Sequence, residues 1–273
     1  MEGHFHSFHS SNHLIMKAFF CLALAVLASI SVAFAQADFE KSIPLKNTQS
    51  IDLQVEYGDL KIQSWDQDRV FIKGKVIIND GKNNDSYKIE AKYKNDKLIV
   101  SFDIPDIKNI PKMYWEEIDG KRVFYDTKEE IKGKKGYSSG VYTDGELEVF
   151  IPRKMATEVH STYGNIAIEN VSAPLEIRNT YGSVEAIFEK ISPSDKIKLT
   201  STYSFVDIHL PKSSDAQVDL ETDYGEIFTD MELDVQDFDE GRFGTGRIKA
   251  NINDGGGTLI AKATYNNVYL RAR

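Results

Sequence analysis

Three stretches decide the fold of this chain: STYGNIAIEN at residues 161–170, NTYGSVEAIF at 179–188 and STYSFVDIHL at 201–210. In each of them a tyrosine is followed by a small residue and, three positions after the tyrosine, by a branched aliphatic residue. The same arrangement recurs around the tyrosines Tyr57, Tyr163, Tyr181, Tyr203, Tyr224 and Tyr265. A glycine directly follows four of them, as Gly58, Gly164, Gly182 and Gly225. Such regularity indicates a chain built from repeats of one unit.

Apolar and polar residues alternate on both sides of each tyrosine. Around Tyr163 the apolar positions include Val159 before the tyrosine and Ile166 and Ile168 after it. This period of two is typical of half-buried β-strands, and its phase changes at the tyrosine. A corner between two strands explains the change of phase, and glycine suits a corner because it tolerates positive φ. The sequence therefore predicts a strand–corner–strand unit in which the tyrosine is the last inward-facing residue.

The spacing of the tyrosines predicts how the units follow one another. From Tyr163 the intervals are 18, 22, 21 and 41 residues, and the last is about twice the others. A degenerate copy fits the middle of that interval, with Thr245 in the tyrosine position, then Gly246, then Ile248. A unit of this size cannot bury enough apolar surface to fold alone, so we expect the units to stack and share one core.

Two ways of stacking fit this pattern. In a parallel β-solenoid each unit is one coil, and the tyrosines of successive coils form a ladder. In an antiparallel β-meander the residues after each tyrosine are two-residue hairpin turns. Asn266-Asn267 suits such a turn, but Ser204-Phe205 does not, because phenylalanine resists positive φ. The sequence therefore favours an all-β parallel solenoid, with the meander as the alternative.

The repeats resemble a known family. The matching residues are DGELEVFIPRKMATEVHSTYGNIAI from Asp144, the copies described above, and GRIKANINDGGGTLIAKATYNNVYLRAR from Gly246. They are similar to the bacterial putative-adhesin family of exported β-repeat proteins, roughly over residues 144–273 with a first coil at 43–62. The resemblance implies a right-handed β-helix-like fold and a place at the cell envelope.

The chain divides into four predicted parts. Residues 1–35 are expected to be a removed signal peptide, because an apolar run after Lys17 ends in the small-x-small pattern Ala33-Phe34-Ala35. Residues 36–104 are an N-terminal β region with the first coil, 105–143 an insertion or loop, and 144–273 the β-repeat coils. No later stretch is apolar enough to cross a bilayer. We therefore expect an exported protein in the periplasm, associated with the outer membrane, or at the cell surface.

The insertion at 105–143 interrupts the repeats and concentrates aromatic residues. A small hairpin centred on Asp119-Gly120 is predicted in the insertion, and alternation on both sides of residues 94–97 predicts another hairpin before it. The aromatic residues of the insertion are candidates for partner binding, because exposed rings offer large contact areas. They are Tyr114, Trp115, Phe124 and Tyr125. The alternative is that the insertion is simply a small hairpin over the side of the coils.

An acidic segment is the second candidate surface. Residues 213–241 contain eleven acidic residues and neither lysine nor arginine. Asp219, Glu221 and Asp223 occupy alternate positions of one predicted strand and should form an outward acidic face. Such a face is either simply solvated or holds Ca²⁺, which binds several oxygen ligands. A polysaccharide-cleaving site would also need a base, and this segment supplies none.

The composition narrows the remaining classes of function. A net charge of −9 argues against nucleic acid as a partner. His160 and His209 lie in different coils at outward positions, and no nucleophile, phosphate-loop or zinc motif occurs. We therefore expect no catalytic residue, cofactor or metal, and a binding, adhesin-like or structural role with a protein or glycan of the cell envelope. The alternatives are a carbohydrate-active enzyme on the same scaffold and a Ca²⁺-stabilised surface module.

Overall fold

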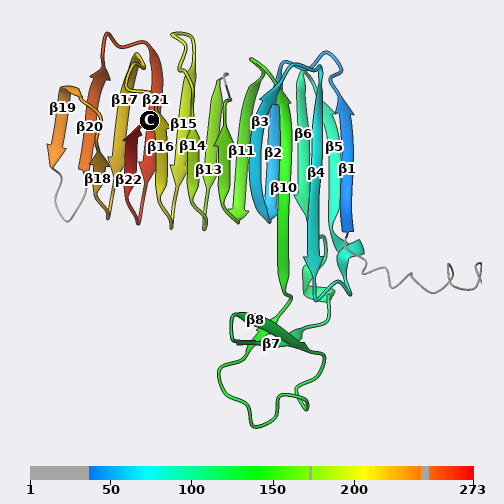
Figure 1. Ribbon diagram of the computed structural model, residues 1–273. Helices are drawn as coiled ribbons and strands as arrows, with labels where there is room; N and C mark the ends of the chain where they lie inside the picture. Colours follow the sequence, from blue (N-terminus) through cyan, green and yellow to red (C-terminus); the bar gives the residue numbers. More distant parts are fainter. Residues whose placement is uncertain (1–36, 172–173, 241–245) are drawn as a thin grey trace, which may run out of the picture. The chain divides into compact units, whose positions relative to one another are not determined.

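Two long β-sheets, A and B, face each other and enclose one hydrophobic core in the computed structural model (Figure 1). The structure describes residues 37–171, 174–240 and 246–273, so the predicted signal peptide lies outside the described residues. In spatial order, sheet A contains β1 (Ala37–Pro44), β4 (Arg69–Ile78), β10 (Thr143–Pro152), β3 (Asp59–Trp65), β12 (Ile166–Glu169), β14 (Val184–Ile187), β16 (Val206–Leu210), β22 (Val268–Ala272) and β18 (Ile227–Thr229). Sheet B contains β19 (Asp234–Glu240), β20 (Gly246–Ile252), β17 (Ala216–Thr222), β21 (Gly257–Ala263), β15 (Lys196–Ser201), β13 (Leu175–Asn179), β11 (Ala156–Tyr163), β2 (Ser50–Tyr57), β6 (Lys97–Asp103) and β5 (Lys88–Lys94).

The prediction of an all-β fold is confirmed, because the described chain consists of strands with two short 3₁₀ turns, Asn84–Ser86 and Ile107–Asn109. No helix in the described ranges is long and apolar enough to cross a membrane. Each tyrosine corner joins a strand of sheet B to a strand of sheet A, as in β11–β12 and β13–β14. The meander alternative is therefore wrong, since the two strands at a corner lie in different sheets and do not form a hairpin.

The coils stack in register, so equivalent positions of successive repeats form columns in the core. Val159, Ile177, Leu199, Ala261 and Leu220 follow one another across sheet B through parallel pairing, and all are fully buried. The sheets are mixed, however. Strands β1, β4, β5, β19 and β20 pair antiparallel with their neighbours at the two ends of the stack. The structure thus has parallel coils in the middle and antiparallel strands at both ends.

The tyrosines lie outside the corners, so the prediction that they face inward is wrong. Their rings stack on one another, and those of Tyr163, Tyr181, Tyr203, Tyr224 and Tyr265 are between 45% and 61% exposed. The residue two positions earlier takes the inner place instead, as Asn179 does. Its side-chain amide donates to the carbonyl oxygens of Gly164 (2.9 Å) and Ser183 (3.1 Å). Ser201 and Thr222 donate to corner carbonyls in the same way, which satisfies buried acceptors, whereas apolar Val55 and Ala263 take this place at the corners of Tyr57 and Tyr265.

The order of the coils in space differs from their order in the sequence. The final coil, β21–β22, lies between β15–β16 and β17–β18. Thr245 lies outside the described residues, and the strand that follows it, β20, pairs antiparallel with β17 inside sheet B. The degenerate copy is therefore not a coil corner. The antiparallel hairpin β19–β20 lies within the 41-residue interval between Tyr224 and Tyr265. The alternation of apolar residues in its strands does not reveal which sheet the hairpin joins.

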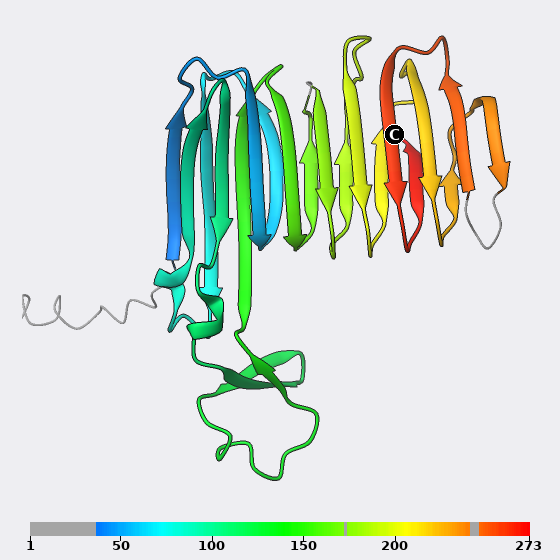
Figure 2. The same cartoon turned by 180° about the vertical axis from the view of Figure 1, so that it is seen from behind.

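A third sheet, C, contains β8 (Lys121–Tyr125), β7 (Met113–Ile118) and β9 (Ser138–Gly140). Figures 1 and 2 show it projecting beyond the end of β10. The hairpin predicted at Asp119-Gly120 is present, because Ile118 pairs with Lys121. The hairpin predicted at residues 94–97 is present as well, between β5 and β6.

Candidate binding surfaces

Asn79 binds both ends of the segment that carries sheet C, where this segment departs from the long sheets and where it returns to them. Its amide nitrogen donates to the carbonyl oxygen of Pro111 (2.8 Å), and its amide oxygen accepts from the backbone N–H of Tyr142 (3.0 Å). Its own backbone N–H donates to the carbonyl oxygen of Tyr142 (3.0 Å). Asn79 is buried, at the end of β4. The two ends of the segment are therefore tied side by side, independently of what lies between them.

Sheet C has two faces, and the four predicted aromatic residues are divided between them. Pairing of Trp115 with Phe124 puts these two rings on one face, here called the Trp115 face. Both contact the ring of Tyr142, with centroids 5.6 and 4.9 Å away, and all three rings are half-buried. Arg122 lies over the same tyrosine ring at 5.1 Å. Because Tyr142 is also bonded to Asn79, this face anchors sheet C to the long sheets.

The opposite face carries Tyr114 and Tyr125, which pair with each other. We call it the Ile118 face after its most exposed apolar side chain. Its exposed apolar side chains are Ile118 (47%), Val123 (36%) and the neighbouring Tyr137 (38%). The ring of Tyr137 meets that of Tyr114 at 6.1 Å. Sequence reasoning missed these three exposed residues, although strict alternation along the predicted hairpin would have separated its two faces.

A charged contact fixes the Ile118 face. The ammonium group of Lys134 forms an ion pair with Glu116 and also donates to the Tyr125 hydroxyl, which itself donates to Glu116. The hydrogen bond from Lys134 lowers the pKa of Glu116 below its usual value. The carboxylate thus stays ionised, and the loop after β8 is tied to the hairpin. The Ile118 face is therefore held in shape before any partner arrives.

The predicted acidic face is compensated by cations from other strands. Asp219 forms a two-fold hydrogen-bonded ion pair with Arg247 of β20, at 2.8 and 2.6 Å. Lys262 of β21 pairs with Glu221 (2.7 Å) and Asp223 (3.2 Å). The hydrogen bond to Asp219 raises the pKa of Arg247, and that to Glu221 raises the pKa of Lys262. Sequence reasoning missed both cations because they come from strands far along the chain.

These pairs also bear on the Ca²⁺ alternative. A site for Ca²⁺ needs several free oxygen ligands directed at one point. Within residues 37–171, 174–240 and 246–273, no group of three or more His, Cys, Asp or Glu side chains is arranged to hold a metal ion. The three acidic residues instead serve as partners for Arg247 and Lys262.

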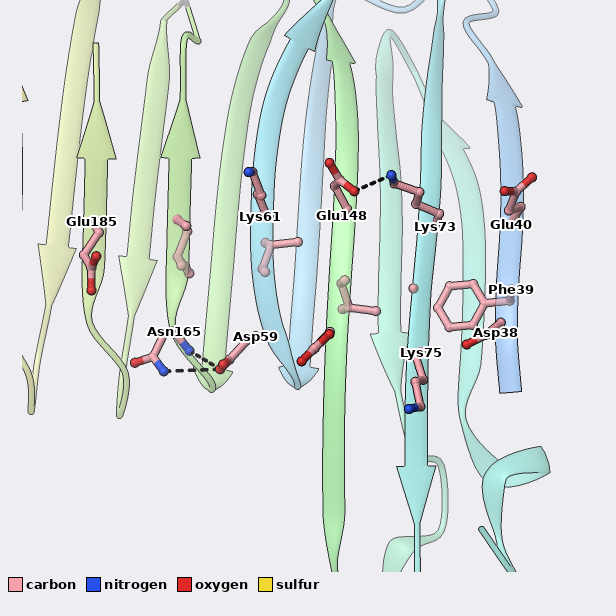
Figure 3. A pocket seen from close by; sticks show the side chains of 16 residues that line it. Asp38, Phe39, Glu40, Asp59, Lys61, Lys73, Lys75, Glu148, Asn165 and Glu185 are labelled. Atoms are coloured by element: carbon pink, nitrogen blue, oxygen red, sulfur yellow. Dashed lines mark hydrogen bonds and ion pairs between the residues drawn. The ribbon is translucent and has the colours of Figure 1, made fainter. Parts of the chain in front are cut away.

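A shallow groove of about 930 Å³ runs across the outer face of sheet A, over β1, β4, β10, β3, β12 and β14 (Figure 3). The groove opens beside β12, where the small side chain of Ala167 pairs with Lys61 and Glu185 on its two neighbouring strands. Across the other strands charges alternate, as in the ion pair of Lys73 with Glu148 at 2.6 Å. The lining carries six carboxylates and three lysines, so part of its acidic charge is unmatched, and the groove suits polar contacts with a ligand.

Two carboxyl groups on the outer face of sheet B share a hydrogen bond. Glu56 of β2 and Asp103 of β6 line a hollow of about 520 Å³ together with His160. The hydrogen bond to Asp103, partial burial and the charge of Asp103 raise the pKa of Glu56. Burial and the neighbouring Glu56 raise the pKa of Tyr57 to about 12. Glycosidases separate their two carboxyl groups by about 5 Å or more, so this directly bonded pair does not match their arrangement.

The histidines predicted to lie on the surface belong to different sheets. His160 is on β11 of sheet B, whereas His209 is on β16 of sheet A, 3.3 Å from Asp207. Asp207 is already bonded by Arg271, at 2.8 and 3.0 Å. The two imidazoles therefore do not act on one common point.

Among the described residues, the six corner tyrosines form one continuous ladder of stacked rings. Neighbouring ring centroids lie 5.0–5.4 Å apart, with interplanar angles of 5–12°. Its order is Tyr57, Tyr163, Tyr181, Tyr203, Tyr265, Tyr224. Because each inner ring has both faces covered by its neighbours, the ladder exposes ring edges and hydroxyl groups. The stacking itself explains the repeat, since aromatic pairs in this geometry stabilise a fold.

Comparison with known proteins agrees with this architecture. Residues 141–267 match the family model described as Toastrack DUF4097, which confirms the resemblance stated from the sequence. A putative cell adhesion protein from Clostridium sporogenes has a TM-score of 0.54 at 12% identity, over 87% of this chain and 100% of that one. This likeness shows a shared fold.

Two further solved structures are less similar. They are putative adhesins from Bacteroides fragilis and Parabacteroides merdae, with TM-scores of 0.28 and 0.25 at 10% and 8% identity. They cover 86% and 85% of this chain and 98% and 95% of their own. No curated protein is significantly similar to the sequence.

Proposed function

We propose that this protein is an exported, non-catalytic binding protein of adhesin-like type, acting at the cell envelope. Its scaffold is a right-handed β-solenoid of the Toastrack DUF4097 type, and its contact surface is the Ile118 face of sheet C. The partner is a protein or a glycan of the envelope. Two observations outside the site support this proposal: the signal-peptide pattern of residues 1–35, and the shared fold with a protein described as a putative cell adhesion protein.

The observation that carries the proposal is the exposure of Ile118, Val123 and Tyr137 on an element that projects from the long sheets. Sheet C is anchored through its other face, so these three side chains do not hold it in place. Exposed apolar side chains grouped on one surface are typical of sites that bind partners. Aliphatic and aromatic side chains recognise apolar patches of proteins and the faces of sugar rings alike.

The alternatives receive less support from the geometry. An enzyme needs reactive groups that converge on one point, but the charged side chains of the sheet A groove are spread over five strands, and Lys73 is held by Glu148. The Glu56–Asp103 pair is too close to enclose a glycosidic bond. A Ca²⁺-stabilised module needs free carboxylates, whereas Asp219, Glu221 and Asp223 are paired with cations.

The proposal is tested with a triple variant, Ile118→Ser with Val123→Ser and Tyr137→Ser. The chain from residue 36 and this variant are presented to envelope fractions and to a glycan array. We expect binding to fall at least about 10-fold, because losing contacts worth 1.4 kcal/mol or more changes affinity by that factor. Phe228→Ser is the matched control, since Phe228 is 43% exposed but lies on sheet A.

A deletion tests the same surface independently. Residues 113–140 are replaced by a short glycine–serine linker, which leaves Pro111, Tyr142 and their bonds to Asn79 in place. The long sheets should keep their thermal stability while binding is lost. Binding that survives both changes would show that the contact surface lies elsewhere and would overturn the proposal.

A further inference from the structure

Sheet B ends on each side in a seven-residue edge strand that pairs with one neighbouring strand of the sheet. At one end, here called the head, lies β5 (Lys88–Lys94), and at the other, the tail, lies β19 (Asp234–Glu240). An edge strand offers unpaired backbone N–H and C=O groups to another strand. The head is held in shape, because the Tyr93 hydroxyl donates to the carbonyl oxygen of Pro44 (2.6 Å) and Lys41 donates to that of Ile89 (2.5 Å). Apart from the Ile89 carbonyl, which Lys41 already occupies, both edges offer backbone groups to another strand.

The tail exposes apolar side chains that point to the core side of sheet B. Val235 pairs with buried Ala250, and Phe238 pairs with Ile248, so both face inward. They are nevertheless 51% and 57% exposed. The reason is that β20 and β19 extend sheet B two strands beyond β17, whereas sheet A stops at β18. The apolar side of this hairpin lacks a covering strand.

The outward sides of the two edges carry opposite charge. On β19 the outward residues include Asp234, Asp237 and Asp239. On β5 they are Lys88, Glu90, Lys92 and Lys94, where Glu90 pairs with Lys92 at 2.7 Å. The inward residues of β5 are Ile89, Ala91 and Tyr93. Placed side by side, the edges would match lysine with aspartate outside and apolar with apolar inside.

The strand directions also match. The coil strands of sheet B are parallel to one another, and β5 runs against them because it pairs antiparallel with β6. Strand β19 runs with them, because β17, β20 and β19 reverse direction twice. When one copy follows another along the sheet, β19 and the next β5 are therefore antiparallel. Opposite charges directly across such a pair stabilise it.

The ends of the two sheets are stepped in a complementary way. At the tail, sheet B is two strands longer than sheet A. At the head, sheet A continues beyond β3 with three strands, β10, β4 and β1, while sheet B continues beyond β2 with two, β6 and β5. Head-to-tail stacking would leave a gap of one strand in sheet A. Met231 and Leu233 from the β18–β19 connection pack against the core at this position.

We propose that the protein binds a second copy of itself head to tail, with β19 of one copy adding to β5 of the next, so that sheet B continues from copy to copy. This goes beyond the proposed binding role, since it uses neither face of sheet C. A tail-to-tail dimer is disfavoured because it would bring the aspartates of both copies together. A head-to-tail contact does not close on itself in two copies, so longer chains follow.

Cysteine cross-linking tests the arrangement, because residues 36–273 contain no cysteine. Glu90→Cys marks the head and Asp237→Cys marks the tail, with Lys92→Cys as a second head variant for the neighbouring register. We expect disulfide-linked dimers in a mixture of head and tail variants, since facing residues in an antiparallel pair are close enough to be bridged. Carrying both cysteines on one chain should give a ladder of longer covalent oligomers.

Two outcomes of the cross-linking experiment would overturn the head-to-tail arrangement. Cross-linking of the tail variant with itself would show a tail-to-tail dimer instead. Absence of cross-links with either head variant, together with a single monomer mass in sedimentation at increasing concentration, would rule out self-association. A charge-reversed head, Lys88→Glu with Lys92→Glu and Lys94→Glu, should weaken association at least 10-fold. The sheet C triple variant should associate as the unchanged chain does, which keeps this test separate from that of the proposed function.

Discussion

The corner tyrosines stabilise the fold through one another rather than through the core. Each inner ring of the ladder is covered by two neighbours, while its edge and hydroxyl remain in solvent. The spacing between rings follows from the distance between paired strands, which is about 4.8 Å. The ladder therefore requires an aromatic ring at every coil, but it does not require the hydroxyl group.

Tyr181 tests this division. It stacks on Tyr163 at 5.1 Å and on Tyr203 at 5.0 Å, and its hydroxyl has no hydrogen-bond partner among the described residues. Tyr181→Ala should lower the free energy of unfolding by about 1–3 kcal/mol, because two aromatic pairs are lost. Tyr181→Phe should change it by less than about 0.5 kcal/mol. Denaturant unfolding measures both.

The end of the ladder supplies the control. Within the described part of the chain Tyr224 stacks on Tyr265 alone, so Tyr224→Ala should lower the free energy of unfolding by about half as much as Tyr181→Ala. Equal losses at the two positions would mean that the tyrosines act through some contact other than ring stacking.

The Glu56–Asp103 pair predicts a pH dependence. The folded state raises the pKa of Glu56 above 4.5, its ordinary value, so the protonated form is favoured on folding. This contribution to stability is fully present below the ordinary value and is lost as pH rises through the raised pKa. Glu56→Gln, which cannot ionise, should therefore stabilise the protein at neutral pH by roughly 0.5 kcal/mol, typical of a cross-strand like-charge contact.

The measurement is thermal unfolding of the variant and the unchanged chain between pH 4 and pH 8. The difference in melting temperature should shrink as pH falls, because Glu56 becomes protonated in the unchanged chain. A difference that stays constant with pH would show that the carboxyls do not share a proton. Glu185→Gln serves as the control, since Glu185 is exposed and lies on sheet A.

At the scale of single elements, the sequence predicts strands better than it predicts their partners. Alternation around Tyr163 and Tyr181 determines which side chains are buried, and the structure buries them. The prediction for the tyrosine itself is wrong, because the local pattern does not reveal that the residue two positions earlier takes the inner corner, where Asn179 bonds backbone carbonyls. Asn179 carries that information only once Gly164 is known to lie beside it.

The candidate surfaces show the same limit. The predicted hairpin at Asp119-Gly120 exists, yet its aromatic residues point to two opposite faces, and the exposed residues are aliphatic or come from the loop. The acidic strand β17 exists as well, but the sequence could not foresee that Arg247 would be its neighbour. Which face of the hairpin is exposed and which strand lies beside β17 both depend on pairing between residues far apart in the sequence. That pairing is determined by the assembly of whole sheets.

At the scale of the whole molecule, the final coil holds two parts of the stack together. Strands β21 and β22 lie between β15–β16 on one side and β17–β18 on the other. In a simple solenoid the C-terminal unit is the last in the stack, and its loss costs only one interface. Here the C-terminal unit is internal, so residues 216–252 depend on it although they precede it in the chain.

A chain that ends at Gly256 tests this dependence. It lacks the buried side chains of Leu259, Val268 and Leu270, each worth about 1.5–3 kcal/mol, and it uncovers both neighbouring coils. The melting temperature should fall by roughly 10 °C or more. Hydrogen exchange should show residues 216–252 losing protection, while the coils that contain Tyr57 and Tyr163 keep theirs, because they retain their neighbours.

A synthetic peptide of residues 257–273 should restore part of that protection by entering the vacant place between the coils, whereas a peptide of the same composition in scrambled order should not. If the truncated chain instead keeps slow exchange throughout residues 216–252, then these strands do not rely on the final coil, and the interleaved order of the stack cannot be what holds its C-terminal half together.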